Sequence, residues 1–424
     1  MGITALNIKQ STSASKLVQP SDLVYIGAFK LPDTPGGMGW EWAGNEMSAM
    51  TYYPTGDSNG TSDGFPGSIY GTGNDQLKYI SEISIPVPVI SQNKNPGDLN
   101  TAETLQDFKN VLGTKIEGME LPKVGLEYLP KQGNQTSDKL YYCFGQHIQD
   151  QERNPSHGCF ELNLSNPQLA GDWKIDNQLN YLTTYYIFSI PKEWADINTP
   201  GKYIVTGRYR DGGQGSQGPC IFAYGPWNEG NPPLSGTELS NIPLLQYSSI
   251  TDPENHVMDN YKHSDEWNGG AWLNSRDKSA VIFVGTKGIG NTWYGFSDGT
   301  VWPTSGEGPF PPVPVISPTF YGEDLRGWWS DSFQAQILFY DPADLAEVAK
   351  GTMQPYDPQP YAKLNIDQYL FNIKSSKQKD RVGAVAFDRG RGILYVLEPL
   401  VDGDKPIIHV WQIKDSKTDP ANKK

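Results

Sequence analysis

Short hydrophobic runs separated by Gly, Asp and Pro recur along the whole chain. The last of them, within residues 380–414, are VGAVAFD, ILYVLEP and IIHVWQI, all rich in β-branched and aromatic residues. Runs of this kind, bounded by turn-forming residues, are typical of β-strands joined by tight connections. The pattern therefore predicts a three-stranded unit, whose strands are called A, B and C in chain order.

Four earlier segments repeat this unit and add a fourth strand, D. The first begins with EMSAMTYYP (46–54) and continues with GSIYGTG, QLKYISEISIP and TLQDFKNVL. The second contains GLEYLP, KLYYCFGQ, GCFELNL and GDWKI, and the third contains YYIFSIP, YIVTGRYR, PCIFAYGP and IPLLQY. The fourth contains NGGAWL, AVIFVGTK, QAQILFYDP and PYAKLNI. Repeats of this kind are typical of propeller blades.

The final unit lacks a strand D, whereas residues 24–32 (VYIGAFKLP) form a hydrophobic run with no unit of their own. If the units close into a ring, this run completes the last blade and removes an exposed sheet edge. The sequence therefore predicts an all-β fold, a five-bladed β-propeller closed by an N-terminal strand and spanning residues 24–414. We expect residues 1–23 to form an N-terminal arm and residues 415–424 to form a disordered polar tail. A pair of sandwiches or a β-solenoid fits the unequal repeats less well.

One segment departs from the strand pattern. Residues 341–351 (DPADLAEVAKG) have helical spacing, with Asp near the start and Gly after the end. Both residues are typical of helix boundaries. We therefore expect a short helix between strands C and D of the fourth blade.

Composition narrows the possible partners and the location. The formal net charge is -14 and no basic stripe is present, which argues against a nucleic-acid partner. The chain has no apolar run long enough to span a membrane, so we expect no transmembrane segment. No apolar stretch typical of a signal peptide is visible near the start, yet an acidic, aromatic-rich chain low in Cys and Lys resembles many secreted proteins. We therefore expect an extracellular or cell-surface location.

The three cysteines are too few for a disulfide scaffold. Cys159 and Cys220 fall at the same place in their repeats, which favours small apolar packing residues within strands. A bridge between Cys143 and Cys159 is the alternative.

Strand direction assigns the connections to two faces. Antiparallel strands alternate in direction, so B–C loops and the D–A connections between blades share one face. The A–B turns on the other face consist mostly of Gly, Asp, Asn and Ser, as plain turns do. The B–C loops are richer in reactive side chains, and we predict the functional site among them: 72–76, 145–158, 207–219, 286–332 and 398–406.

In blades two and three, the B–C loops contain His147, His157, Arg208, Arg210 and Asp211. Arg208 and Arg210 are two residues apart, so they share one side of their strand. A Gly-rich stretch follows Asp211 and lets the backbone approach a ligand closely. We expect these five residues to contact polar or anionic groups of a substrate, with His147 also catalytic. The alternatives are pairing of the arginines with carboxylates of neighbouring blades, and ordinary loop histidines.

The blade-four B–C loop is expected to exceed forty residues. It contains Trp293, Tyr294, Trp328 and Trp329 among many Pro and Gly residues. Long loops inside compact domains are usually functional, and aromatic rings in rigid loops are good platforms for sugars. The alternative is a self-packed aromatic cluster that caps the channel.

Three acids occupy equivalent positions in strand A, which lines the central channel. Glu46, Glu266 and Asp380 each precede the end of their strand by eight residues, in blades one, four and five. These blades are consecutive around the ring, so the acids should cluster at the channel mouth. Such a cluster can hold Ca²⁺ or Mg²⁺, or raise the pKa of one carboxyl group for acid–base catalysis. Alternatively, the acids pair with arginines, and Glu41 or Asp265 replaces one of them if the register differs.

The strings YIVTGRYRDGGQGSQGPCIFAYGPW, QILFYDPADLAEVAKG and RGILYVLEPLVDGDKPIIHVWQI resemble a group of largely uncharacterised bacterial β-propeller proteins. More distantly, a five-bladed ring resembles furanosidase-type glycoside hydrolases, which use three acids from the inner strands of consecutive early blades. This chain offers Glu46 in blade one and Glu127 in blade two, but no acid in strand A of blade three. Propeller polysaccharide lyases, which use His, Tyr and Arg, are a second comparison.

We therefore predict an extracellular protein that binds or cleaves a carbohydrate through its B–C face. The ligand is expected to be a polysaccharide or another glycan, with Ca²⁺ as the possible cofactor. If the protein is an enzyme, it is expected to be a glycoside hydrolase or a polysaccharide lyase. Glu46, Glu266 and Asp380 are the predicted catalytic or cation-holding acids. The competing functions are a non-catalytic scaffold or surface-assembly protein, and a metal-dependent hydrolase of another substrate.

Overall fold

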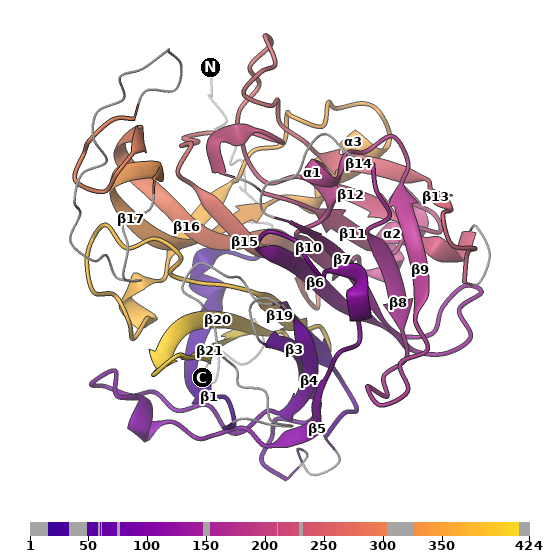
Figure 1. Ribbon diagram of the computed structural model, residues 1–424, viewed down its shortest axis with the longest axis horizontal. Coiled ribbons are helices and arrows are strands. Elements are labelled where there is room, and N and C mark those ends of the chain that lie inside the picture. Colours follow the sequence, from indigo (N-terminus) through magenta and orange to yellow (C-terminus); the bar gives the residue numbers. More distant parts are fainter. Residues whose placement is uncertain are drawn as a thin grey trace, which may run out of the picture.

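The computed structural model describes residues 16–33, 49–57, 60, 62–73, 77–146, 153–209, 211–228, 232–302 and 326–414. Five mainly antiparallel sheets surround a common centre (Figure 1), which confirms the predicted five-bladed β-propeller. Blade one consists of β2 (Met50–Tyr53), β3 (Ser68–Gly73), β4 (Tyr79–Ser84) and β5 (Thr104–Lys109). Blade two consists of β6 (Pro122–Leu129), β7 (Lys139–Gln146), β8 (His157–Phe160) and β9 (Ala170–Ile175), with β13 (Glu238–Leu239) added parallel to β9.

The other three blades have the same order from the centre outward. Blade three consists of β10 (Tyr186–Ser189), β11 (Ile204–Gly207), β12 (Ile221–Tyr224) and β14 (Asn241–Leu245). Blade four consists of β15 (Glu266–Ser275), β16 (Lys278–Gly295), β17 (Gly327–Tyr340) and β18 (Ala362–Asn365). Blade five consists of β19 (Val385–Asp388), β20 (Ile393–Asp402), β21 (Lys405–Ile413) and, on its outer edge, β1 (Leu23–Lys30).

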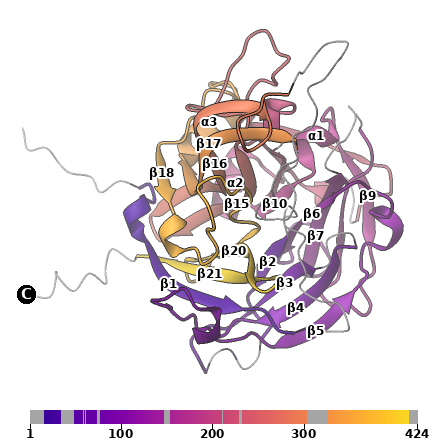
Figure 2. The same cartoon turned by 60° about the vertical axis from the view of Figure 1, so that its left-hand side comes forward.

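The N-terminal strand closes the ring, as the sequence predicted. β1 runs antiparallel to β21, from Leu23 opposite Ile413 to Lys30 opposite Ile407, and Figure 2 shows the two strands side by side at the edge of the blade. Phe29 of β1 is fully buried, so the strand contributes to the core as well as to the sheet.

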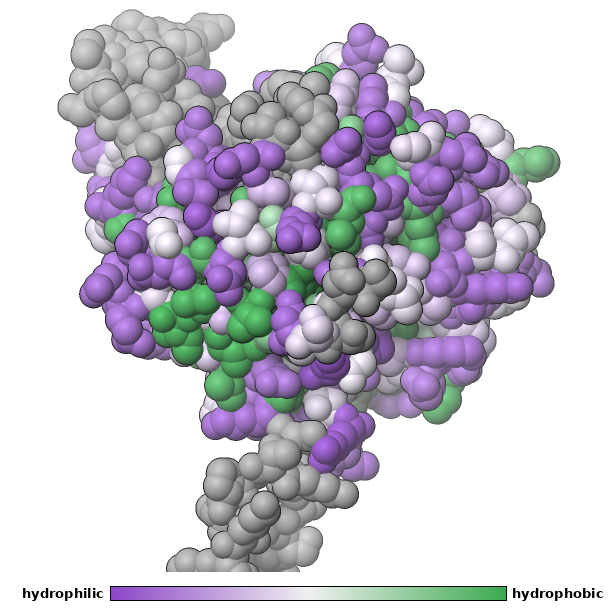
Figure 3. Space-filling view, turned by 90° about the horizontal axis from the view of Figure 1, so that it is seen from below, coloured by the Kyte–Doolittle hydropathy of each residue, from purple (hydrophilic) through white to green (hydrophobic). Residues whose placement is uncertain are grey.

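The connection between β4 and β5 covers part of the outer edge of β1. An isolated bridge joins Ala28 to Val89, and nearby Val87 and Ile90 are 42% and 51% exposed. Figure 3, which views the ring from below Figure 1, shows hydrophobic residues gathered in one area of an otherwise mixed surface. The rim at the closing blade is therefore partly apolar.

The predicted helix in blade four is confirmed as α3 (Pro342–Ala349), between β17 and β18. The Asp341 carboxylate caps it by accepting a hydrogen bond from the Ala343 backbone N–H at 2.8 Å. Two short helices, α1 (Asn180–Thr183) and α2 (Lys192–Asn198), were not predicted. Among the described residues, no helix is long and apolar enough to cross a membrane.

The blade-four connection differs most from the prediction. β16 and β17 are 18 and 14 residues long, and their pairing continues to Gly295 opposite Gly327. The prediction of a loop over 286–332 is therefore wrong at both ends of that range. Residues 286–295 belong to β16 and residues 327–332 belong to β17, and the two strands form an extended hairpin. The Gly and Ser residues obscured a run of Thr and aromatic residues that favours strand pairing. Trp293, Tyr294, Trp328 and Trp329 thus lie in strands.

Side chains of neighbouring sheets fill the space between blades. Phe188 of blade three contacts Phe283 of blade four edge-to-face, with ring centroids 6.4 Å apart. The three cysteines are free and buried, which confirms the packing interpretation and excludes the Cys143–Cys159 bridge. Burial raises the pKa of each thiol to about 12, so the thiols stay protonated at neutral pH.

A chain of hydrogen bonds links the inner region of all five blades near the A–B end of the channel. The Glu127 carboxylate of blade two accepts from the Thr51 hydroxyl of blade one at 3.1 Å and from the Ser189 N–H of blade three at 2.8 Å. Arg389, in the turn after β19 of blade five, donates to the Ser189 carbonyl at 3.0 Å and to the Asn274 side chain of blade four at 2.9 Å. These five residues fasten the ring at its centre.

Candidate functional site

The blade-four hairpin has two distinct faces on the B–C side of the ring. Trp293 lies opposite Trp329 and Tyr294 lies opposite Trp328 in the β16–β17 register. Because successive residues of a strand point to opposite faces, the first pair occupies one face and the second pair the other. The four predicted aromatic residues are thus brought together on one hairpin, but in two sets.

Two lysines cover the first face. The Lys377 ammonium lies 5.3 Å from the ring centroid of Trp293, and the Lys379 ammonium lies 4.0 Å from that of Trp329. Both distances are typical of cation–π contacts. Trp329 is only 6% exposed. This face is therefore packed against the connection from blade four to blade five.

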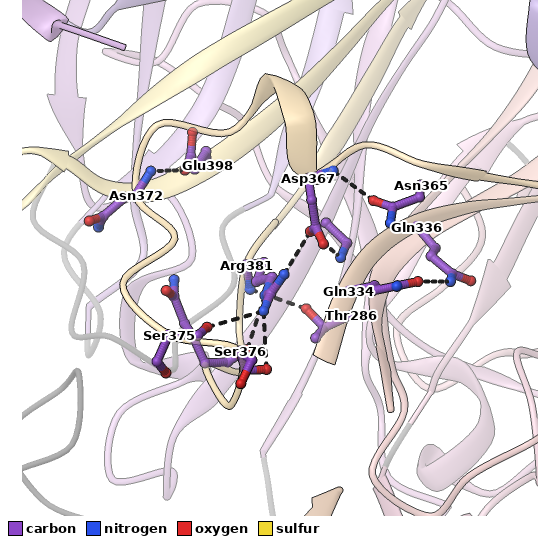
Figure 4. Close-up of polar contacts among 12 residues, drawn as sticks. Thr286, Gln334, Gln336, Asn365, Asp367, Asn372, Ser375, Ser376, Arg381 and Glu398 are labelled. Carbon is purple, nitrogen blue, oxygen red and sulfur yellow. Dashed lines mark hydrogen bonds and ion pairs between the residues drawn. The ribbon is translucent and has the colours of Figure 1, made fainter. Parts of the chain in front are cut away.

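Arg381 fixes that connection, as Figure 4 shows. Its guanidinium forms an ion pair with Asp367 at 2.8 Å and donates to the carbonyl oxygens of Ser375 and Ser376 at 3.2 and 3.3 Å. Its backbone N–H donates to the Thr286 hydroxyl of β16 at 3.1 Å. Arg381 thus joins the connection to β16 at the base of the hairpin. Lys377 and Lys379 join the same connection to the outer part of the hairpin.

The second face carries a line of four half-buried rings, which we call the aromatic row. Ring centroids are 5.5 Å apart between Tyr294 and Trp328, 4.5 Å between Trp328 and His263, and 5.3 Å between His263 and Tyr261. Tyr261 and His263 belong to the connection from blade three to blade four, which shares the B–C face. Each ring is partly exposed to solvent.

Gly212 of the blade-three B–C loop contacts two residues of the row, His263 and Trp328. Its N–H donates to the His263 carbonyl at 2.6 Å, and its φ of +75° lies in the left-handed region that glycine favours. A Cβ at this position would lie 2.5 Å from Nε1 of Trp328. The Gly-rich stretch was predicted to let the backbone approach a ligand closely. In the structure, the backbone at Gly212 closely approaches the indole of Trp328.

The row offers both flat apolar faces and hydrogen-bond donors. Within the described part of the chain, neither the Tyr294 hydroxyl nor the Trp328 indole N–H has a hydrogen-bond partner. Burial lowers the pKa of His263, so its imidazole is neutral at neutral pH, and Nδ1 lies 3.3 Å from the Tyr261 hydroxyl. Aromatic faces beside a few free donors are a typical lining of sites for uncharged polar ligands.

A buried ion pair anchors the end of the segment that carries Tyr261 and His263. The Asp265 carboxylate, with no exposed surface, accepts from the Lys287 ammonium at 2.8 Å and from the Gly288 N–H at 2.9 Å. It also accepts from the Lys262 N–H at 3.0 Å. Burial raises the pKa of Asp265 to about 6, although the lysine opposes this shift. The pair fastens the connection to β16.

The predicted residues of blade three lie partly inside the fold. Arg208 is 2% exposed and donates to the Gln146 carbonyl at 2.8 Å and to the Thr184 hydroxyl at 3.3 Å. Its guanidinium also lies 5.2 Å from the centroid of the Tyr181 ring. The guanidinium is therefore engaged between blades two and three. Arg210 lies outside the described residues, and of Asp211 only the backbone is described.

His157 is the first residue of β8 and not a loop residue, which corrects the expected loop boundary. It is fully buried because its ring packs between blades two and three, where Nε2 lies 2.9 Å from the Thr206 hydroxyl and Nδ1 lies 2.9 Å from the Ser156 hydroxyl. Burial lowers its pKa to about 3. The other predicted histidine, His147, lies outside the described residues.

Two of the three predicted acids flank the same residue. Glu266 is paired with Thr286 across β15 and β16, and the Thr286 hydroxyl accepts from the N–H of Arg381, which follows Asp380. Asp380 is buried, with a φ of +50°. The described residues include no group of three potential metal ligands. Glu46 lies outside them, so a calcium site formed by all three acids stays a prediction.

The sequence did not identify Tyr261 and His263 as site residues. The usable signal was their position in a D–A connection, on the same face as the B–C loops. A hydrogen-bonded set formed by half-buried Tyr25 and buried His409 and Glu398 was also missed. The His409 ring bridges the Tyr25 hydroxyl at 3.0 Å and the Glu398 carboxylate at 2.7 Å, and Glu398 accepts from the Asn372 N–H at 2.7 Å.

Comparisons with known proteins do not assign a family. No protein-family model matches the chain, and no curated protein matches it. Among solved structures, the β-propeller domain of Cps50 (Swd1) from Myceliophteria thermophila is similar at 7% sequence identity, with a TM-score of 0.25. The alignment covers 90% of this chain and 100% of that one. A likeness at this level carries no functional argument.

Proposed function

We propose that this propeller is a carbohydrate-binding protein and that its ligand lies along the aromatic row on the B–C face. The observation that carries the proposal is the row itself, four partly exposed rings in line with two free donors at its blade-four end. The apolar faces of sugar rings fit flat against aromatic rings, and their hydroxyls accept hydrogen bonds from O–H and N–H groups.

The way the row is held also favours binding. Trp293 and Trp329 on the opposite hairpin face are covered by lysines. Gly212 packs against Trp328, and the Asp265–Lys287 ion pair joins the connection that carries Tyr261 and His263 to β16. A ligand therefore meets rings that are already in place, which lowers the entropy cost of association. A row of four rings also offers space for more than one sugar unit, as in a polysaccharide.

The proposal concerns binding and not cleavage. Glycoside hydrolysis needs two carboxyl groups that face each other across the scissile bond. Asp265, which follows His263 by two residues, is buried and engaged by Lys287. Its structural role is thus accounted for without a reaction.

The first prediction concerns Tyr294, whose ring and hydroxyl both face the proposed ligand. A glycan array with the full chain should identify a bound glycan, and calorimetry should then give its Kd. Replacement of Tyr294 by Ala should weaken binding about tenfold, which corresponds to about 1.4 kcal/mol. The matched control is Tyr203→Ala, because Tyr203 is also partly exposed but stacks on Trp227 near the A–B face.

An unchanged Kd for Tyr294→Ala, or an equal loss for Tyr203→Ala, would contradict the assignment of the ligand to the row. Absence of binding to every glycan on the array would remove the carbohydrate proposal. A non-catalytic scaffold would then be the better explanation of the fold.

A further inference from the structure

A depression lies at the rim of the closing blade, beside the outer strand β1. Its volume is about 600 Å³, which is within the usual range for small-molecule sites. Three segments far apart in sequence line it: residues 21 and 23–25 at the start of β1, residues 90–92 and 94 between β4 and β5, and residues 368–369 after β18. The depression therefore forms only when β1 closes the ring.

The lining combines apolar and aromatic surface with positive charge. Ile90 is 51% exposed, and the rings of Tyr25 and Tyr369 lie beside each other with centroids 4.4 Å apart. No Asp or Glu is among the described residues that line the depression, and its two charged residues are Lys94 and Lys414. A molecule that joins an apolar body to a negative charge complements this surface.

Lys94 has a fixed place in the depression. Its φ of +56° lies in the left-handed region, which lysine rarely adopts, and its ammonium donates to the Gln368 carbonyl at 2.5 Å. The same ammonium lies 5.5 Å from the centroid of the Phe371 ring. Among the described residues, the ammonium has this one hydrogen bond. Because a lysine ammonium carries three donors, two remain for a ligand.

The surroundings of Lys94 favour an anionic partner. Burial lowers the pKa of Lys94, because the ammonium loses part of its water, and Glu398 opposes this shift from beyond ion-pair distance. The Glu398 carboxylate is itself engaged by two backbone N–H groups and by His409. The charge of Lys94 is thus partly balanced, and an anion in the depression can replace its missing water with a charge-assisted hydrogen bond.

We propose that this depression binds a small organic acid, with the carboxylate at Lys94 and the apolar body against Ile90 and Tyr369. Hydrogen bonds between an ammonium and a carboxylate are stronger than those between neutral groups, and covering exposed apolar surface is favourable. Lys414 adds a second positive charge at the edge. This inference goes beyond the proposed glycan binding and does not rest on it, because the aromatic row is formed by other elements.

Calorimetry with the full chain tests the proposal. The probes are sodium benzoate and sodium hexanoate, with benzyl alcohol and 1-hexanol as their uncharged counterparts, all at constant ionic strength. We expect saturable binding of at least one acid, and clearly weaker binding of the corresponding alcohol. Lys94→Met should weaken binding of the acid roughly tenfold, as expected for one lost hydrogen bond to a charged group. Because Lys94 is partly exposed, this variant should fold.

Lys350→Met is the matched control, since Lys350 is an exposed lysine at the end of α3 that pairs with Glu347 at 2.8 Å. It should bind the acid as the wild type does. Tighter binding of benzoate would identify an aromatic body and tighter binding of hexanoate an aliphatic one, and either result supports the proposal. Absence of saturable binding for both acids, equal binding of an acid and its alcohol, or binding unaffected by Lys94→Met would overturn it.

Discussion

Residues with the same polar chemistry have different roles here, according to what surrounds them. His157 is enclosed between two blades with a hydroxyl at each ring nitrogen, whereas His263 lies half-buried in the aromatic row. Arg208 is buried inside the fold, where its guanidinium donates to the Gln146 carbonyl, whereas Arg389 reaches a depression open to solvent. Residue type alone could not separate these cases, because burial depends on side chains of neighbouring blades.

His157 should make stability depend on pH. Its pKa falls from 6.5 to about 3 on folding, so below pH 6.5 the unfolded chain binds a proton that the folded chain does not. Stability is therefore lost as pH decreases, by about 2 kcal/mol between pH 7 and pH 5 for this group. Urea unfolding at both pH values should show that His157→Gln removes this part of the loss. Identical pH dependence of the two proteins would contradict the buried, neutral histidine.

Among the elements, the blade-four hairpin depends most on its neighbours. It extends beyond the blade and is held at its base by the Asp265–Lys287 pair and by the contact between Arg381 and Thr286. Its outer part is held by lysines stacked on Trp293 and Trp329. The position of the aromatic row thus depends on charged residues from two connections, not on the strands alone.

Replacement of Asp265 by Asn should destabilise the protein by about 3–5 kcal/mol, because it leaves the Lys287 ammonium buried without its counter-charge. The double variant Asp265→Asn with Lys287→Met removes that charge as well and should recover part of the loss. Chemical denaturation of both variants measures the difference. A double variant less stable than Asp265→Asn would contradict this explanation.

At the scale of the whole molecule, the sequence predicted the architecture better than the site. Short hydrophobic runs predicted the five blades and the closing strand, and helical spacing predicted the helix at 341–351. Each of these features is encoded by a local pattern in the sequence. The hairpin aromatics were identified as site residues but expected in a loop. The row also includes Tyr261 and His263, and the central network joins Thr51 to Arg389, which are far apart in sequence. Contacts between blades of this kind leave no local pattern.

The closing strand should contribute a large share of stability. Phe29 of β1 is fully buried, so Phe29→Ala should cost about 3–5 kcal/mol. Val24 of the same strand is partly exposed, and Val24→Ala should cost clearly less. Urea unfolding of the two variants compares them directly, and equal losses would argue against closure through β1.

The central functional claim is that the B–C face is the binding face, and hydroxyl-radical footprinting tests it most directly. The full chain would be oxidised with and without the glycan selected on the array, and modification would be quantified for each residue by mass spectrometry. The account predicts that the glycan protects Tyr294 and Trp328 and leaves Tyr203 unchanged. Protection of Tyr203 or Phe65 on the A–B side, with Tyr294 and Trp328 still oxidised, would contradict it.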